Sequence, residues 1–145
     1  AFVILGLVPN RKGQPLLVDW QVASRLPGRP FTLEPYEAFV PRAGLKAGQL
    51  PNPGVNVPLQ ALQTALPQAV AGMRQHMVQR QAVFTARMQQ LEVRLARQLE
   101  QVRRSQFERR SQVIRRVFDE YRQWVEETLS TEPEPYLQVL AAVCG

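Results

Sequence analysis

The sequence has little of what catalytic and metal sites are built from. Its 145 residues include one histidine, His76, and one cysteine, Cys144. A four-ligand metal site needs several such residues, and a single cysteine cannot form a disulfide within the chain. The phosphate-binding motif GxxxxGK[ST], the dinucleotide motif GxGxxG and the zinc motif HExxH are also missing. We therefore predict no cofactor, no metal and no catalytic residue in this chain.

Long apolar runs are missing as well, which argues against a membrane span. The apolar run at residues 2–8 covers seven positions, whereas a helix needs roughly 20 apolar residues to cross a bilayer. A secretory signal would also carry a basic start and a small-residue cleavage site. We expect a cytoplasmic chain with no membrane contact. Because residues 2–8 and 136–143 both read as strands, we also expect a domain of a larger protein.

Most of the prolines and glycines lie in the first 58 and the last 15 residues, and helix-forming residues dominate between them. Residues 1–58 read as strands and loops ending in a linker, residues 59–130 as a helical coiled-coil arm, and residues 131–145 as a strand that returns to the sheet. The predicted fold class is α+β. A small antiparallel sheet from both chain ends is expected to support a long Arg-rich helical arm.

The first part is expected to supply three strands. Residues 2–8 and 16–23 are apolar runs joined by a polar segment, and Gly13 in that segment can take a positive φ, so the pattern predicts a hairpin. A short third strand is expected at residues 31–33. Residues 41–58 hold seven proline and glycine residues and predict a linker without regular structure.

Prolines also set the expected ends of the helices. Pro58 fits a first helical turn, and Pro67 is expected to divide a short leading helix from a long one. Pro133 disfavours helical geometry at Glu132, so the long helical part is expected to stop near Ser130.

The helical part carries an apolar stripe with a spacing of three or four residues, which marks one face of a helix. Its members are Val70, Met73, Met77, Phe84, Met88, Leu91, Leu95, Leu99 and Val102. Because the stripe is narrow, it predicts pairing with one or two other helices in a coiled coil. The methionines in it are expected to fill a core.

A second apolar face follows beyond residue 112, and it is wider and more aromatic. It consists of Val113, Ile114, Val117, Phe118, Tyr121, Trp124, Val125 and Leu129. This width predicts deeper burial than for the first stripe. Two arrangements fit: one unbroken rod of about 60 residues, or an antiparallel coiled-coil hairpin that folds near residues 103–112 and supplies its own partner.

Positive charge gathers where that fold is expected. The net charge of +6 divides into +8 for residues 59–118 and −5 for residues 119–145, with the remainder in the first part. Arginines at this density can neutralise phosphates, which predicts sequence-independent contact with the backbone of duplex DNA. The candidate nucleic-acid-binding residues are Arg103, Arg104, Arg109, Arg110, Arg115 and Arg116.

A solvated helix face explains the same arginines without any ligand. Several of them stand four residues from an acidic side chain, which is the spacing of ordinary ion pairs on a helix. The pairs with this spacing are Glu100 with Arg104, Arg104 with Glu108, Arg115 with Asp119, Arg116 with Glu120, and Arg122 with Glu126. Both interpretations of the arginine cluster stay open at this stage.

The two residues best suited to chemistry have no neighbours in the sequence that would support it. No carboxylate or cysteine stands near His76, so we expect a surface or packed histidine, not a metal ligand. Cys144 is expected to be a small apolar side chain on the last strand, since no base can be identified for it.

Residues 118–136 combine an aromatic and acidic helix end with a proline-broken strand. Together with residues 65–70, this segment resembles the carboxy-terminal region of large bacterial Swi/Snf-type helicase-like proteins, some of which belong to DISARM-type phage-defence loci. The resemblance covers residues 59–140. It implies a parent chain that is an ATP-driven translocase on duplex DNA, with this part as an accessory module. It carries no catalytic residue to this sequence, because the ATP-binding and helicase motifs of such proteins lie elsewhere.

The sequence thus leads to two functional hypotheses. One is a non-catalytic accessory domain of a helicase-like protein that contacts the backbone of duplex DNA. The alternative is a coiled-coil module for protein interaction or self-association, with no role in nucleic-acid binding.

Overall fold

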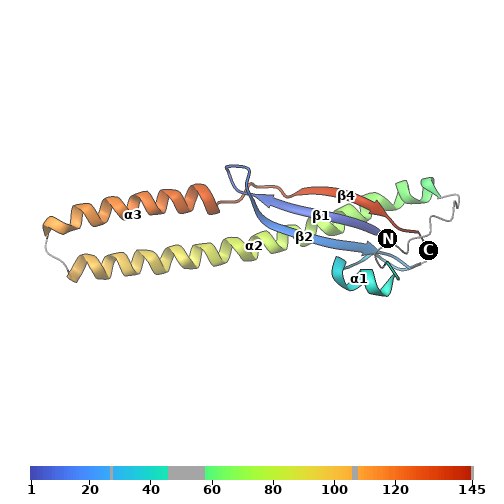
Figure 1. The fold of residues 1–145 in the computed structure, drawn as a ribbon, viewed down its shortest axis with the longest axis horizontal. Helices are drawn as coiled ribbons and strands as arrows, with labels where there is room; N and C mark the ends of the chain where they lie inside the picture. The colour runs from blue at the N-terminus through green and yellow to red at the C-terminus, as the bar shows by residue number, and fades with distance from the viewer. Residues whose placement is uncertain (27, 46–57, 106–107, 145) are drawn as a thin grey trace.

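The computed structural model describes residues 1–26, 28–45, 58–105 and 108–144, and for residues 103–105 and 108–111 it describes the backbone alone. Four strands form one antiparallel sheet (Figure 1): β1 (Phe2–Pro9), β2 (Pro15–Ser24), β3 (Thr32–Pro35) and β4 (Tyr136–Ala142). Their order is β3-β2-β1-β4, so the first and last strands of the chain are neighbours. The predicted α+β fold, with a sheet from both chain ends, is confirmed.

The helix α2 (Leu59–Ser105) packs on one face of this sheet and makes the main core. Alternate residues of β1 point toward α2, and Phe2, Ile4 and Val8 are buried there because side chains two apart in a strand share a face. Met73 and Met77 of α2 are fully buried against them. The methionines at these two positions therefore fill the core as predicted, but they pack on the sheet and not on a coiled-coil partner.

Gly6 stands between those buried residues and lets the helix approach the sheet. A Cβ atom built on Gly6 would lie 2.6 Å from Met73 Cε and from Met77 Cγ and Sδ. Carbon and sulfur atoms in contact are normally 3.5 Å or more apart, on the order of their van der Waals separation. The absence of a side chain at Gly6 therefore sets how closely α2 packs on β1.

The prediction that Pro67 divides two helices is wrong, because α2 runs through it without a break. Proline removes one helical hydrogen bond and crowds the preceding turn. Ala65 and Ala69, on either side of Pro67, are both buried against the sheet. Their packing fixes the helix on both sides of the proline and outweighs this local cost.

A short helix that the sequence analysis did not predict, α1 (Tyr36–Arg42), covers part of the other face of the sheet. Its Phe39 is buried against Val3 and Val22. The predicted linker is therefore wrong at residues 41 and 42, which are helical, and residues 46–57 lie outside the described residues. Pro41 is held in this helix because burial of Phe39 outweighs the hydrogen bond that a proline cannot donate.

Beyond the sheet, α2 continues as one half of a helical hairpin whose other half is α3 (Glu108–Leu129) (Figure 1). Side chains of the two helices meet around a hollow of about 140 Å³, lined by Leu95 and Leu99 of α2 and by Phe118 and Val125 of α3. The hairpin alternative is confirmed, and the unbroken rod is wrong. The helix α3 ends at Leu129, close to Ser130, where the sequence placed the end of the helical part because of Pro133.

Within the described residues, no helix is apolar over enough length to cross a bilayer.

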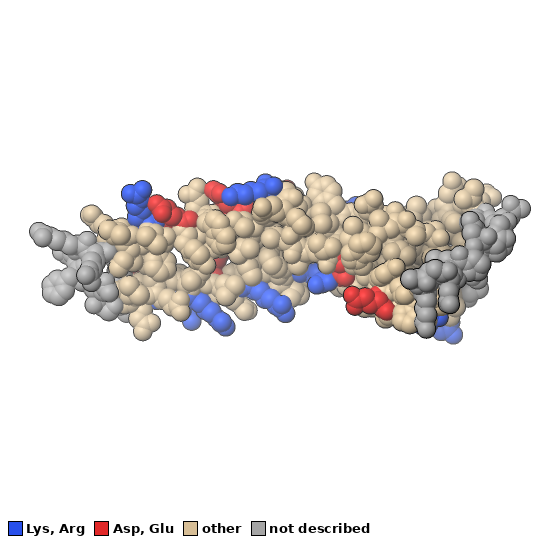
Figure 2. Space-filling model, viewed as in Figure 1, with Lys and Arg blue, Asp and Glu red and all other residues tan. Residues whose placement is uncertain are grey.

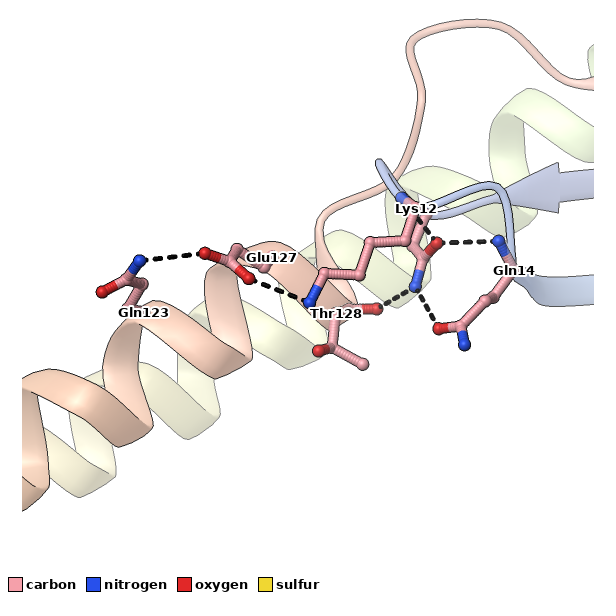
Figure 3. A network of polar contacts seen from close by, with 6 residues as sticks. Lys12, Gln14, Gln123, Glu127 and Thr128 are labelled. Atoms are coloured by element: carbon pink, nitrogen blue, oxygen red, sulfur yellow. Dashed lines mark hydrogen bonds and ion pairs between the residues drawn. The ribbon is translucent and has the colours of Figure 1, made fainter.

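The turn between β1 and β2 holds the base of this arm (Figure 3). Asn10 is 1% exposed, and its Nδ2 donates to the Thr128 carbonyl at 2.9 Å and to Gln14 Oε1 at 3.0 Å. Its Oδ1 accepts hydrogen bonds from the backbone N–H groups of Lys12 and Gln14, at 2.9 and 2.8 Å. Gly13 has φ +77°, which confirms the predicted glycine turn. The side chain of Asn10 thus joins the turn to α3.

A surface ion pair lies beside that joint. Lys12 Nζ is 2.9 Å from Glu127 Oε2, and both side chains are about half exposed. Hydrogen bonds from Lys12 and from Gln123 hold the pKa of Glu127 below its usual range. Because the pair is open to solvent, it contributes little to stability beside the buried amide of Asn10.

Candidate interaction surfaces of the helical arm

The hairpin brings the predicted arginines to one end of the arm. Arg103 and Arg104 belong to the last turn of α2, and Arg109 and Arg110 to the first turn of α3. The side chains of these four lie outside the described residues. Their backbone positions place all four at the end of the arm that points away from the sheet.

Arg115 and Arg116 lie nearly two turns further along α3, and both are exposed. Arg116 Nε donates to Glu120 Oε1 at 3.0 Å, with 83% and 64% of the two side chains exposed. This confirms one of the ion pairs predicted from four-residue spacing. A pair so exposed is worth only about 0.3–0.5 kcal/mol, so it leaves Arg116 able to exchange Glu120 for another anion.

Two other predicted pairs are wrong. Arg115 and Asp119 do not come within ion-pair distance, and neither do Arg122 and Glu126, although all four side chains are described. Glu126 instead lies 4.0 Å from Arg11 of the β1–β2 turn. The cationic face near Arg115 is therefore less neutralised by its own helix than the sequence spacing suggested.

The apolar face of α3 is only half covered, which contradicts the prediction that it is buried more deeply than the first stripe. At 100° per residue it spans about 160° of the helix. The half that includes Phe118 and Val125 faces α2, and Val125 is buried at 7% exposure. Since α2 is the one helix beside it in the described residues, the other half stays in solvent.

We refer to that uncovered half as the α3 stripe. It consists of Val113, Val117, Tyr121 and Trp124, which are 67%, 57%, 46% and 52% exposed. Tyr121 stands at the edge of the stripe, because it also lines the hollow between α2 and α3. The rings of Tyr121 and Trp124 stack with centroids 5.9 Å apart. Four apolar side chains that follow one another at helical spacing form a continuous patch, and such patches mark interaction surfaces. Figure 2 shows charged side chains along both margins of the molecule, with uncharged surface between them.

His76 has a carboxylate partner that the sequence analysis missed. Its Nε2 lies 2.7 Å from Oδ2 of Asp19 on β2, and Arg80 of α2 pairs with the same oxygen. Burial opposes the charged form of Asp19, but hydrogen bonds from His76 and Arg80 outweigh it and hold the pKa of this carboxyl below its usual range. His76 is thus a packed histidine, as predicted. Sequence spacing could not show this contact, because 57 residues separate the partners.

Acid is expected to remove the contribution of this pair to stability. A carboxyl whose pKa is lower in the folded chain stabilises fully above its unfolded pKa of about 4, and the contribution is lost as the pH falls through the folded pKa. The free energy of unfolding should therefore fall more steeply below pH ~4 in the wild type than in Asp19→Asn. Urea denaturation at neutral and acid pH measures this. Parallel profiles would show that Asp19 is not linked to folding.

The remaining reactive groups form no site. Within the described residues, no three His, Cys, Asp or Glu side chains are placed to hold a metal ion together. Cys144 is exposed and follows the end of β4, so the expectation that it is an apolar side chain on the last strand is wrong.

No protein family, curated protein or solved structure matches this chain. The resemblance to helicase-like proteins stays a prediction.

Proposed function

We propose that the chain is a non-catalytic interaction module whose arm binds a protein partner through the α3 stripe. The observation that carries the proposal is the uncovered half of the apolar face of α3. A helix with an apolar face this wide is typical of bundles in which it contacts two neighbours. The hairpin supplies one neighbour, α2, so a partner has to supply the second.

The free energy that a partner would gain by burying the α3 stripe supports this proposal. Full burial of a large apolar side chain stabilises by about 1.5–3 kcal/mol, and each member of the α3 stripe retains about half its surface. A partner that covers all four would therefore gain on the order of 4 kcal/mol from the stripe. Leu91 of α2, which is 45% exposed, offers further apolar surface on the arm. A cytoplasmic location, where an exposed thiol such as Cys144 stays reduced, is part of the proposal.

Photo-crosslinking tests it directly. A photoreactive amino acid at Val117 of the full chain is expected to form an adduct with a protein partner in cells that produce it. The same residue at Gln112, which is exposed on α3 but lies away from the stripe on the helical wheel, is expected to form none. Mass spectrometry of the adduct identifies the peptide that contacts position 117. Absence of adducts from Val117, or equal adducts from both positions, would refute the proposal.

A second candidate function is contact with the backbone of duplex DNA, as in an accessory domain of a helicase-like translocase. The observation that favours it is the gathering of six arginines toward one end of the arm, of which Arg115 and Arg116 are described and exposed. Contacts of this kind position a protein on DNA without reading its sequence.

Salt dependence tests this second candidate. Each phosphate contact contributes about 0.9 to the slope of log affinity against log salt concentration, so the double variant Arg115→Glu and Arg116→Glu is expected to lower the slope by about 2. Fluorescence anisotropy with a labelled duplex at several salt concentrations measures it. The double variant Arg25→Glu and Arg29→Glu carries the same charge change near the sheet and serves as control. If both variants bind DNA equally well, the arm does not contact DNA.

A further inference from the structure

We infer that the partner of the α3 stripe is a second copy of this chain, whose α3 runs antiparallel to the first. The inference rests on the proposed function and adds the identity of the partner. Its grounds are the order of side chains along the stripe, the distribution of charge along α3, and the position of the arm relative to the sheet.

The stripe is complementary to itself when it is reversed. Its amino-terminal members, Val113 and Val117, are small, and its carboxy-terminal members, Tyr121 and Trp124, are large. A two-fold axis near Asp119 places Val113 opposite Trp124 of the second copy. It also places Val117 opposite Tyr121. Large side chains then face small ones along the whole contact, which is how helices interdigitate in a packed core. A two-fold interface presents the same patch from both copies, so each contact between a small and a large side chain occurs twice.

The distribution of charge along α3 also favours antiparallel pairing of the two helices. Residues 112–118 hold two arginines and no acid, whereas residues 119–129 hold four acids and one arginine. Antiparallel pairing brings the cationic half of one helix beside the acidic half of the other, on both sides of the axis. Parallel pairing would bring like charges together, which destabilises a helical interface. Of these charged residues, Arg116, Glu120 and Glu127 lie beside the stripe on the helical wheel. Antiparallel pairing brings Arg116 of each copy close to Glu120 of the other, which favours a reversed copy of the same helix.

The shape of the molecule leaves room for this pairing. The arm extends beyond the sheet along the strand direction (Figure 1), so two reversed arms can lie side by side with their sheets at opposite ends. The overlap is limited to α3 itself, which has 22 residues and a length of about 33 Å. The pairing therefore requires no change in either copy.

Sedimentation over about two orders of magnitude in concentration tests the inference, because a dimer dissociates on dilution. The wild type is expected to change from monomer to dimer as its concentration rises. Val117→Glu places a charge at the centre of the contact and is expected to stay monomeric. Gln112→Glu introduces the same charge on α3 outside the stripe and is expected to dimerise like the wild type. Circular dichroism verifies that both variants fold, and folding is expected because Val117 is already 57% exposed in the single chain.

The crosslinker at Val117 distinguishes the possible failures. An adduct of twice the chain mass, joined through the peptide that holds Tyr121, supports the inference. A monomer at every concentration with an adduct to a different protein overturns the second copy as partner and leaves the interaction function standing. A monomer with no adduct overturns both. A dimer that Val117→Glu does not weaken shows that the copies meet through another surface, and it also overturns the inference.

Discussion

Replacing Asn10 by alanine is expected to lower the free energy of unfolding by about 3 kcal/mol, because it leaves polar groups without partners at the base of the arm. The Asn10 side chain is almost fully buried and makes four hydrogen bonds. Without it, the backbone N–H groups of Lys12 and Gln14 and the carbonyl of Thr128 lose an acceptor or donor. Chemical denaturation monitored by circular dichroism measures the loss.

Two further variants separate the contribution of the buried Asn10 amide to stability from that of the nearby surface ion pair. Lys12→Ala removes the exposed ion pair with Glu127 and is expected to cost far less than Asn10→Ala. Asn10→Asp keeps the two accepted hydrogen bonds but turns a carboxylate oxygen toward the Thr128 carbonyl, so it is expected to cost at least as much as Asn10→Ala. Hydrogen exchange in the last turn of α3 is expected to rise in both Asn10 variants, because Thr128 belongs to that turn. If Asn10→Ala cost no more than Lys12→Ala, the amide would not be what holds the arm.

Gly6→Ala and Gly72→Ala are expected to change stability in opposite directions. The added methyl at Gly6 would stand 2.6 Å from atoms of Met73 and Met77, and overpacking of this kind costs about 1–3 kcal/mol. At Gly72, inside α2, the nearest atom is Leu33 Cδ1 at 3.9 Å, an ordinary contact. There alanine is expected to stabilise by up to about 1 kcal/mol, because glycine is a poor helix former.

A double-mutant cycle checks the cause at Gly6. Met77→Ala alone is expected to cost about 2–5 kcal/mol through the cavity it leaves. Combined with Gly6→Ala, it removes two of the three atoms that clash and leaves Met73 Cε, so the pair should cost less than the two single losses together. Strictly additive losses would show that the methyl at Gly6 does not act through Met77.

Most elements of the fold could be predicted from local sequence patterns. The two apolar runs, the turn at Gly13 and the stop before Pro133 depend on neighbours in the sequence, and the structure confirms all three. The failures at Pro41 and Pro67 have one cause. A proline disfavours a helix locally, but burial of Phe39, Ala65 and Ala69 against the sheet decides these helices, and sequence spacing does not show which sheet lies beneath them.

The interaction surface was predictable in part, for a similar reason. The width of the apolar face on α3 is a property of the sequence, whereas its burial depends on how many helices lie beside it. The width of the face predicted deep burial of Val113, Tyr121 and Trp124, but the single chain leaves these side chains exposed. The pair of His76 and Asp19 depends on α2 crossing β2, which no local pattern could show.

The position of β1 between β2 and β4 has a consequence for biosynthesis. The partner of one edge of β1 is β2, which follows it directly in the chain, whereas its other edge pairs with residues 136–142. On the ribosome, the helical hairpin therefore emerges before β1 can complete its ladder. Contacts so distant in sequence are slow to form, and an unpaired strand edge attracts other chains while it waits. We therefore expect the outer edge of β1 to stay unpaired in the nascent chain until residues 136–142 have been made.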